Sequence, residues 1–127
     1  MNTITIVAGQ TDVTGSTSKY LRAPNGTYAD RISAALYVAD TQNNRIQKWS
    51  SSAQDGITVA GSSTSAPDAD AESLTAPYGI FVDEQTEVLY VADTANNRVQ
   101  RWIPNALQGD TIVGGQGMNI VFATSLQ

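Results

Sequence analysis

A repeat of 53 residues dominates this sequence and limits what the chain can fold into. The segment LYVADTQNNRIQKW begins at Leu36, and LYVADTANNRVQRW begins at Leu89, 53 positions later. The match extends upstream without a gap, so residues 21–49 and 74–102 agree at 16 of 29 positions. A repeat of this length indicates a fold made of stacked supersecondary units.

The second unit contains four short segments with strand character. Residues 78–83 follow Pro77 and are largely apolar, residues 88–92 are continuously apolar, residues 98–102 are mixed, and residues 111–114 end the unit. Turn-forming residues separate them, and no window places apolar residues at helical spacing over three turns. The sequence therefore predicts an all-β fold with four antiparallel strands per unit.

The segment at 88–92 is expected to be the most buried of the four. Its side chains are apolar on both faces, as is typical of a strand that is covered on both sides. The same holds for residues 36–39 in the first unit. In the innermost strand, Ile80, Phe81 and Val82 of the second unit are expected to bury more apolar area than their first-unit counterparts.

Four antiparallel strands in a unit of about 50 residues are typical of a β-propeller blade. The pattern P-x-G-I-x-V-D, followed by L-Y-V-A-D-T-x-N-N-R-[IV]-Q-x-W and T-[IV]-x-G, resembles the NHL repeat over about Leu21 to Gly115. This resemblance implies a propeller, most often six-bladed. Members of the family include scaffold proteins, substrate-binding parts of ubiquitin ligases, sensor domains and amidating lyases.

The chain is too short to close such a ring, because 127 residues correspond to about 2.4 blades and the smallest usual ring has four. We expect an incomplete propeller, either a fragment of a longer protein or a subunit of an assembly. The expected parts are a leftover fourth strand at 3–8, blade one at 21–61, blade two at 74–115, and an atypical tail at 116–127 that includes a strand.

Polar residues recur in the turn between the second and third strands of each unit. Asp and Asn favour turns because they bond to nearby backbone and tolerate left-handed geometry. We interpret the set as structural, with each carboxylate binding turn amides and each guanidinium binding that carboxylate or a carbonyl of the next blade. A ligand or metal collar at one pole of the ring is the alternative. The residues are Asp40, Asn43, Asn44, Arg45, Asp93, Asn96, Asn97 and Arg98.

Composition excludes several kinds of chemistry. The chain has no cysteine and no histidine, which excludes thiolate nucleophiles, disulfides and imidazole catalysis. The amidating lyases use metal-binding histidines, so that activity is not expected here. A net charge of −5 argues against nucleic acid and anionic membranes as partners. We find neither a signal peptide nor an apolar run long enough to span a bilayer, and the compartment stays open.

The sequence favours a non-enzymatic module without a cofactor, which binds a protein partner or associates with itself through open blade faces. Two alternatives stay open: a piece of a calcium-dependent hydrolase or lactonase, and a lectin-like carbohydrate binder. Asp68, Asp70 and Glu72 have the spacing of a calcium loop but lack its glycine and final glutamate. Trp49 and Trp102 are expected to pack in the core, with sugar stacking as the alternative. Asn25 begins a glycosylation sequon, Asn-Gly-Thr.

Overall fold

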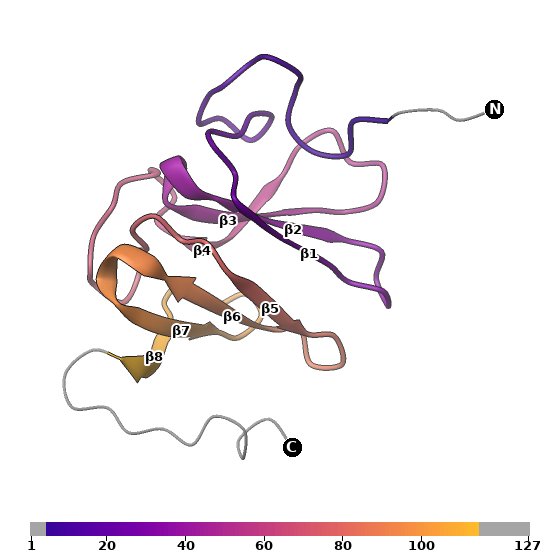
Figure 1. Ribbon diagram of the computed structural model, residues 1–127. Coiled ribbons are helices and arrows are strands. Elements are labelled where there is room, and N and C mark those ends of the chain that lie inside the picture. The colour runs from indigo at the N-terminus through magenta and orange to yellow at the C-terminus, as the bar shows by residue number, and fades with distance from the viewer. Residues whose placement is uncertain (1–4, 115–127) are drawn as a thin grey trace.

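The computed structural model describes residues 5–114, which form two four-stranded antiparallel sheets (Figure 1). Strand order in each sheet follows chain order, so each is a meander. The fold is thus all-β, with two blades of an incomplete propeller. Blade one contains β1 (Gly26–Ala29), β2 (Leu36–Asp40), β3 (Arg45–Trp49) and β4 (Ile57–Gly61). Blade two contains β5 (Ile80–Asp83), β6 (Val88–Asp93), β7 (Arg98–Trp102) and β8 (Asp110–Gly114).

The two blades repeat each other in register as well as in order. Leu36 lies opposite Trp49 in blade one, and Leu89 lies opposite Trp102 in blade two. A short 3-10 turn joins the second and third strands of each blade, at Thr41–Asn43 and Thr94–Asn96. The asparagine that follows each turn is left-handed, as the sequence predicts, with φ of 55° at Asn44 and 54° at Asn97.

Each blade has two faces, which we name after the aromatic residue they carry. The tyrosine face carries Tyr37, Ala39 and Ile46 in blade one, and Tyr90, Ala92 and Val99 in blade two. The tryptophan face carries the residues that alternate with these. Since successive side chains of a strand point to opposite faces, the register settles this division.

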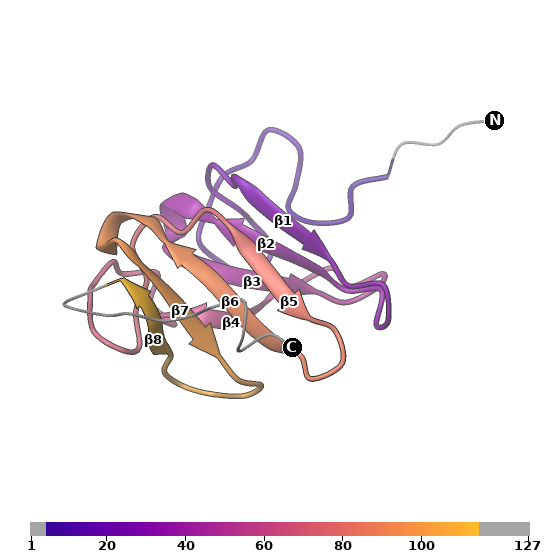
Figure 2. The ribbon, with the colours of Figure 1, turned by 60° about the horizontal axis from the view of Figure 1, so that its bottom comes forward.

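The tyrosine face of blade one packs against the tryptophan face of blade two. Their side chains form one buried cluster, in which Tyr37, Ala39 and Ile46 lie with Val91 and Trp102. Figure 2 shows the inner strands β1 and β5 side by side, and contacts between these two strands agree with the picture. The blades therefore stack head to tail, like neighbouring blades of a propeller.

Coverage of the two blades differs, which corrects one expectation. Residues 37–39 of β2 are all buried, so that strand is covered on both faces. In β6 burial alternates, and Tyr90 and Ala92 on the tyrosine face are only partly buried. In the innermost strand Phe81 is 47% exposed, whereas Val82 beside it is 1% exposed. The physical reason is that neither described sheet covers the tyrosine face of blade two, where the Tyr28 ring of β1 contacts Phe81 edge-on at 5.6 Å.

The ends of the described region also depart from expectation. Residues 5–8 form no strand, because no described strand lies beside them to complete a ladder, and residues 3 and 4 lie outside the described region. Ile6 and Val7 are 57% and 62% exposed. The expected tail at 116–127 lies outside the described residues. Across residues 5–114 there is no helix of a length and apolarity that would cross a membrane.

Candidate functional site

The polar turn of blade one is built around a buried ion pair. Asp40, Asn43 and Arg45 bind one another and the connection that precedes the blade, and we call this set of contacts the fastening. Arg45 Nε lies 2.8 Å from Asp40 Oδ2, and the two side chains are 6% and 0% exposed. Asn43 donates to the same carboxylate oxygen at 2.8 Å. The other oxygen, Asp40 Oδ1, accepts from the Arg22 backbone N–H at 2.7 Å. The carboxylate therefore binds a backbone amide of the segment that leads into the blade, and from its own turn it binds the Asn43 side chain.

The Arg45 guanidinium completes this fastening through three carbonyls. It donates to Ser16 O at 2.8 Å and to Thr17 O and Tyr20 O, each at 3.0 Å. These carbonyls belong to the connection into blade one, whereas the sequence interpretation allowed for a carbonyl of the next blade. A planar guanidinium with five donors suits such a cluster of acceptors.

Blade two repeats the fastening one repeat later, residue for residue. Arg98 Nε lies 2.7 Å from Asp93 Oδ2, and Asn96 donates to that oxygen at 2.9 Å. Asp93 Oδ1 accepts from the Thr75 N–H at 2.7 Å. The guanidinium donates to the carbonyls of Ala69, Asp70 and Ser73. The identical use of both sets supports the structural interpretation of these residues.

The last asparagine of the turn behaves differently in the two blades. Asn44 reaches the connection into blade two, where its Nδ2 donates to Ser65 O at 3.1 Å and its Oδ1 accepts from the Ala76 N–H at 3.0 Å. Asn97 is exposed, and its side chain has no hydrogen-bond partner among the described residues. Asn44 therefore joins two blades, and Asn97 presents the same amide to solvent.

Three further contacts join the blades and were not anticipated from the sequence. Thr41 Oγ1 donates to Pro77 O at 2.8 Å, and Tyr28 OH donates to Glu84 Oε2 at 2.6 Å. A Cβ on Gly26 would lie 1.8 Å from the carbonyl oxygen of Tyr78, so this position has room only for glycine. The signal in the sequence is the repeated Pro-x-Gly, which brings a glycine to the blade contact.

The tyrosine face of blade two carries the same kinds of group at higher exposure. Phe81, Tyr90, Ala92, Val99 and Val113 share this face and are all partly or largely exposed. Of their counterparts, Tyr37, Ala39, Ile46 and Ala60 are 4% exposed or less, and Tyr28, the counterpart of Phe81, is partly buried. Among the described residues, a Cβ on Gly79 would meet only the Ala92 Cβ, at 3.5 Å, which is an ordinary contact. We take this face, with Gly79, Thr94 and Asn97 at its end, as the candidate site.

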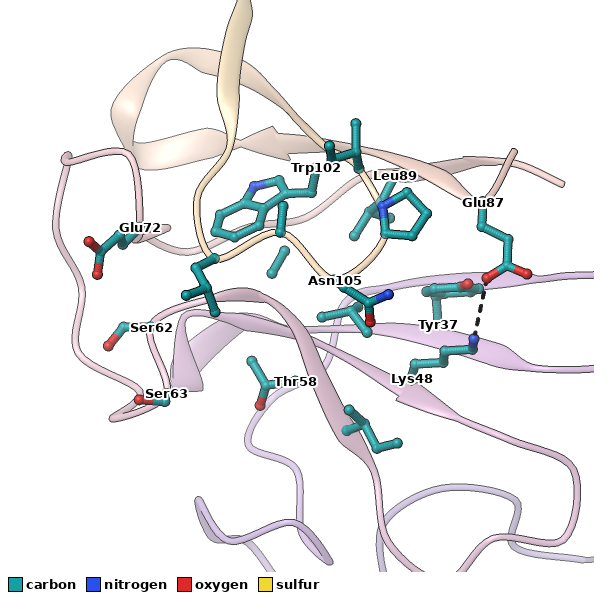
Figure 3. A pocket seen from close by; sticks show the side chains of 18 residues that line it. Tyr37, Lys48, Thr58, Ser62, Ser63, Glu72, Glu87, Leu89, Trp102 and Asn105 are labelled. Carbon is teal, nitrogen blue, oxygen red and sulfur yellow. Dashed lines mark ion pairs between the residues drawn. The ribbon is translucent and has the colours of Figure 1, made fainter. Parts of the chain in front are cut away.

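A cavity of about 520 Å³ lies between the outer parts of the blades (Figure 3). Tyr37, Leu89 and Trp102 line it, and Lys48 and Glu87 form an ion pair of 3.8 Å at its side. Burial together with the Glu87 and Asp30 charges raises the pKa of Tyr37 to about 12. The cavity is lined by residues of both blades, and three of its ionisable groups, Tyr37, Lys48 and Glu87, lie at the contact between them.

The surroundings of the two tryptophans, of the acidic loop and of Asn25 give little support to the binding roles considered for them. Trp49 and Trp102 are each 2% exposed, so neither ring offers a face for sugar stacking. Asp70 accepts from the Glu72 N–H within an exposed loop, and the described residues contain no group of three or more acidic, His or Cys side chains that could bind a metal ion. Asn25 is exposed directly before β1, with its Nδ2 donating to Ala23 O.

Comparison with known proteins gives one informative likeness. The chain is 30% identical over 96 residues to NHL repeat-containing protein 2 of Homo sapiens. The matched part covers 72% of this chain but 13% of that protein. No protein-family model matches the chain. The likeness agrees with the repeated blades and covers only a small part of the relative.

Proposed function

We propose that this chain is a non-enzymatic module of NHL-type repeats, whose function is to bind another protein surface through the tyrosine face of blade two. The observation that supports this most is the contrast between equivalent faces. The tyrosine face of blade one is buried against blade two, whereas the residues of the same face one repeat later are only partly buried. Partly exposed apolar surface of this kind is typical of protein interaction sites.

The polar groups around this face favour a protein partner. Asn44 and Thr41 bind backbone groups of the adjoining connection, and their counterparts Asn97 and Thr94 are exposed. A side-chain amide that can both donate and accept suits a peptide backbone. The partner we propose is therefore a chain that presents an apolar sheet face beside a loop with free backbone groups.

The most conspicuous ionisable residues support a role without catalysis. Asp40, Arg45, Asp93 and Arg98 are the charged residues of the repeated turn, and all four are engaged in the two fastenings. A catalytic acid or base has to reach a substrate, and these side chains are 11% exposed or less beneath the connections. Calcium tests the hydrolase alternative, because a cation that binds only the folded chain raises its melting temperature. We expect no such rise.

A chain with a third unit tests the proposed function. In this variant residues 115–127 are replaced by a second copy of residues 62–114, which supplies a neighbour for blade two. We expect Asn97→Ala and Gly79→Ala to be tolerated in the original chain and to become destabilising in the three-unit chain. The measurement is urea unfolding of each variant, with Asn44→Ala as the matched control that costs stability in both chains.

Two results would contradict the proposal. If Asn97→Ala and Gly79→Ala leave the stability of the three-unit chain unchanged, the face does not accept a blade. If Asn97→Ala already destabilises the original chain as much as Asn44→Ala does, its amide is not available to a partner.

A further inference from the structure

We propose that the partner of this face is a second copy of the same chain, bound head to tail, so that blade two of one copy holds the N-terminal end of the next. The inference rests on the proposed function, because it names the partner of the same surface. It follows from contacts that recur at an offset of one repeat.

The N-terminal end presents the same backbone groups as the connection that blade one holds. Asn44 and Thr41 bind Ser65, Ala76 and Pro77 within the chain. One repeat earlier in the sequence these positions are Asp12, Ala23 and Pro24, and all three are exposed.

Backbone geometry matches at these positions as well. The φ angles of Ser65 and Ala76 are 64° and 50°, and those of Asp12 and Ala23 are 61° and 48°. Left-handed backbone is uncommon in residues other than glycine, so the agreement reflects one loop shape built twice. In a second copy, Asp12 and Ala23 can bind Asn97 as Ser65 and Ala76 bind Asn44.

A glycine is in place for the closest contact. In the chain the Tyr78 carbonyl approaches Gly26, and the residue one repeat before Tyr78 is Asn25. One repeat after Gly26 is Gly79, where a Cβ would meet no described atom closer than the Ala92 Cβ at 3.5 Å. The Asn25 carbonyl of a second copy therefore has the same room beside Gly79.

Charges are complementary between the two copies. Within the chain Arg31 Nε lies 3.7 Å from Glu84 Oε2 across the blade contact, and the Arg31 side chain is 88% exposed. Arg31 and Glu84 are one repeat apart, so docking brings Arg31 of the second copy toward Glu84 of the first. Opposite charges favour this orientation of the copies. The Lys48–Glu87 pair has no counterpart, because the position one repeat before Glu87 is Ala34.

One segment has to move for the copies to fit. Residues 5–8, residues 58–61 of β4 and the strand β8 occupy equivalent positions in successive repeats. The β8 strand of one copy and residues 5–8 of the next therefore occupy the same place. Since β8 is paired with β7 and residues 5–8 are unpaired, β8 stays and residues 5–8 are displaced.

Complementation of two blocked chains tests the proposal. Gly79→Ala blocks the tyrosine face of blade two, because its Cβ occupies the place of the approaching carbonyl. The chain has no cysteine, so Asn25→Cys can be labelled with a polyethylene glycol maleimide, which blocks the N-terminal end. Unlabelled Asn25→Cys controls for the substitution, and circular dichroism checks that every variant is folded.

Sedimentation equilibrium gives the readout. We expect the original chain to rise above its monomer mass of 13.4 kDa with concentration, and each blocked chain to stay at its own monomer mass, which for the labelled chain includes the polyethylene glycol. An equal mixture of the two blocked chains should approach the sum of their two masses, since one free face and one free N-terminal end remain.

Three results would overturn the inference: an original chain that stays monomeric, a mixture that stays monomeric, or a labelled chain that still dimerises by itself through two copies of one face. None of these depends on the three-unit chain. If that chain gains the Asn97 contact while the original chain stays monomeric, the proposed function stands and a second copy is not the partner.

Discussion

The Arg45 guanidinium lies 2.8 Å from the Asp40 carboxylate in a site where both side chains are almost fully buried. The same arginine donates hydrogen bonds to three carbonyls of the connection into blade one. The pair therefore holds together two segments that are more than 20 residues apart in the sequence.

Removing this arginine should be costly. Arg45→Met leaves a buried carboxylate with only its amide donors, and breaking a buried pair in this way costs about 3–5 kcal/mol. Arg31→Met is the control, because that side chain is 88% exposed and its ion pair contributes less than about 1 kcal/mol. Urea unfolding measures both. Equal losses would mean that the Asp40–Arg45 fastening does not stabilise the blade.

The two turn asparagines should differ although their backbone is the same. Asn44→Ala removes the contacts to Ser65 and Ala76, and we expect it to cost about 1–3 kcal/mol more than Asn97→Ala. Both residues have φ near 55°, so the strain of alanine in this conformation cancels in the comparison. The measurement is unfolding at low protein concentration. A loss that is larger for Asn97→Ala would show that Asn97 already has a partner within one chain.

Two glycines one repeat apart should differ in how much stability the chain loses when each is replaced by alanine. Gly26→Ala drives a Cβ toward the Tyr78 carbonyl, and overpacking of this kind costs about 1–3 kcal/mol. Gly79→Ala meets only an ordinary contact, so a change within about 0.5 kcal/mol is expected. Thermal unfolding of dilute samples compares them. Destabilisation by both to the same extent would place a covering segment over blade two.

Alkaline pH should weaken the fold through Tyr37. The pKa of this phenol is about 12 in the folded chain, against about 10 in an unfolded chain. The folded state keeps the proton at pH values where the unfolded state loses it, so the contribution of Tyr37 to stability is complete below pH 10. It falls as the pH rises from about 10 to about 12.

Urea unfolding at several pH values measures this decline. Tyr37→Phe should make the decline shallower, because phenylalanine has no proton to lose. An identical slope for the two chains would contradict the burial of this phenol.

Local sequence patterns predict most of the strands and turns of this fold, but few of the contacts between segments that are distant in the sequence. The 53-residue offset predicted the four strands of each blade, and turn chemistry predicted the left-handed asparagines at 44 and 97. The destination of the Arg45 guanidinium could not be predicted, because its acceptors are carbonyls of residues with no distinctive side chain.

The predicted burial of Tyr90 and Ala92 in blade two was wrong for a similar reason. Tyr90 and Ala92 carry the same apolar signal as the buried Tyr37 and Ala39, and sequence periodicity records which face a residue shares but not how far that face is covered. The candidate site lies at these residues, where pattern and burial disagree.

The most direct test of a docking surface on blade two is a concentration series of ¹H–¹⁵N NMR spectra. The account predicts that amide signals of Gly79, Ala92 and Val99 shift as the concentration rises, together with those of Asp12, Ala23 and Asn25. Signals of Ala39 and Ile46, the buried counterparts in blade one, should stay in place. Spectra that do not change with concentration would contradict docking by a second copy, and shifts confined to other faces of the blades would contradict the docking surface itself.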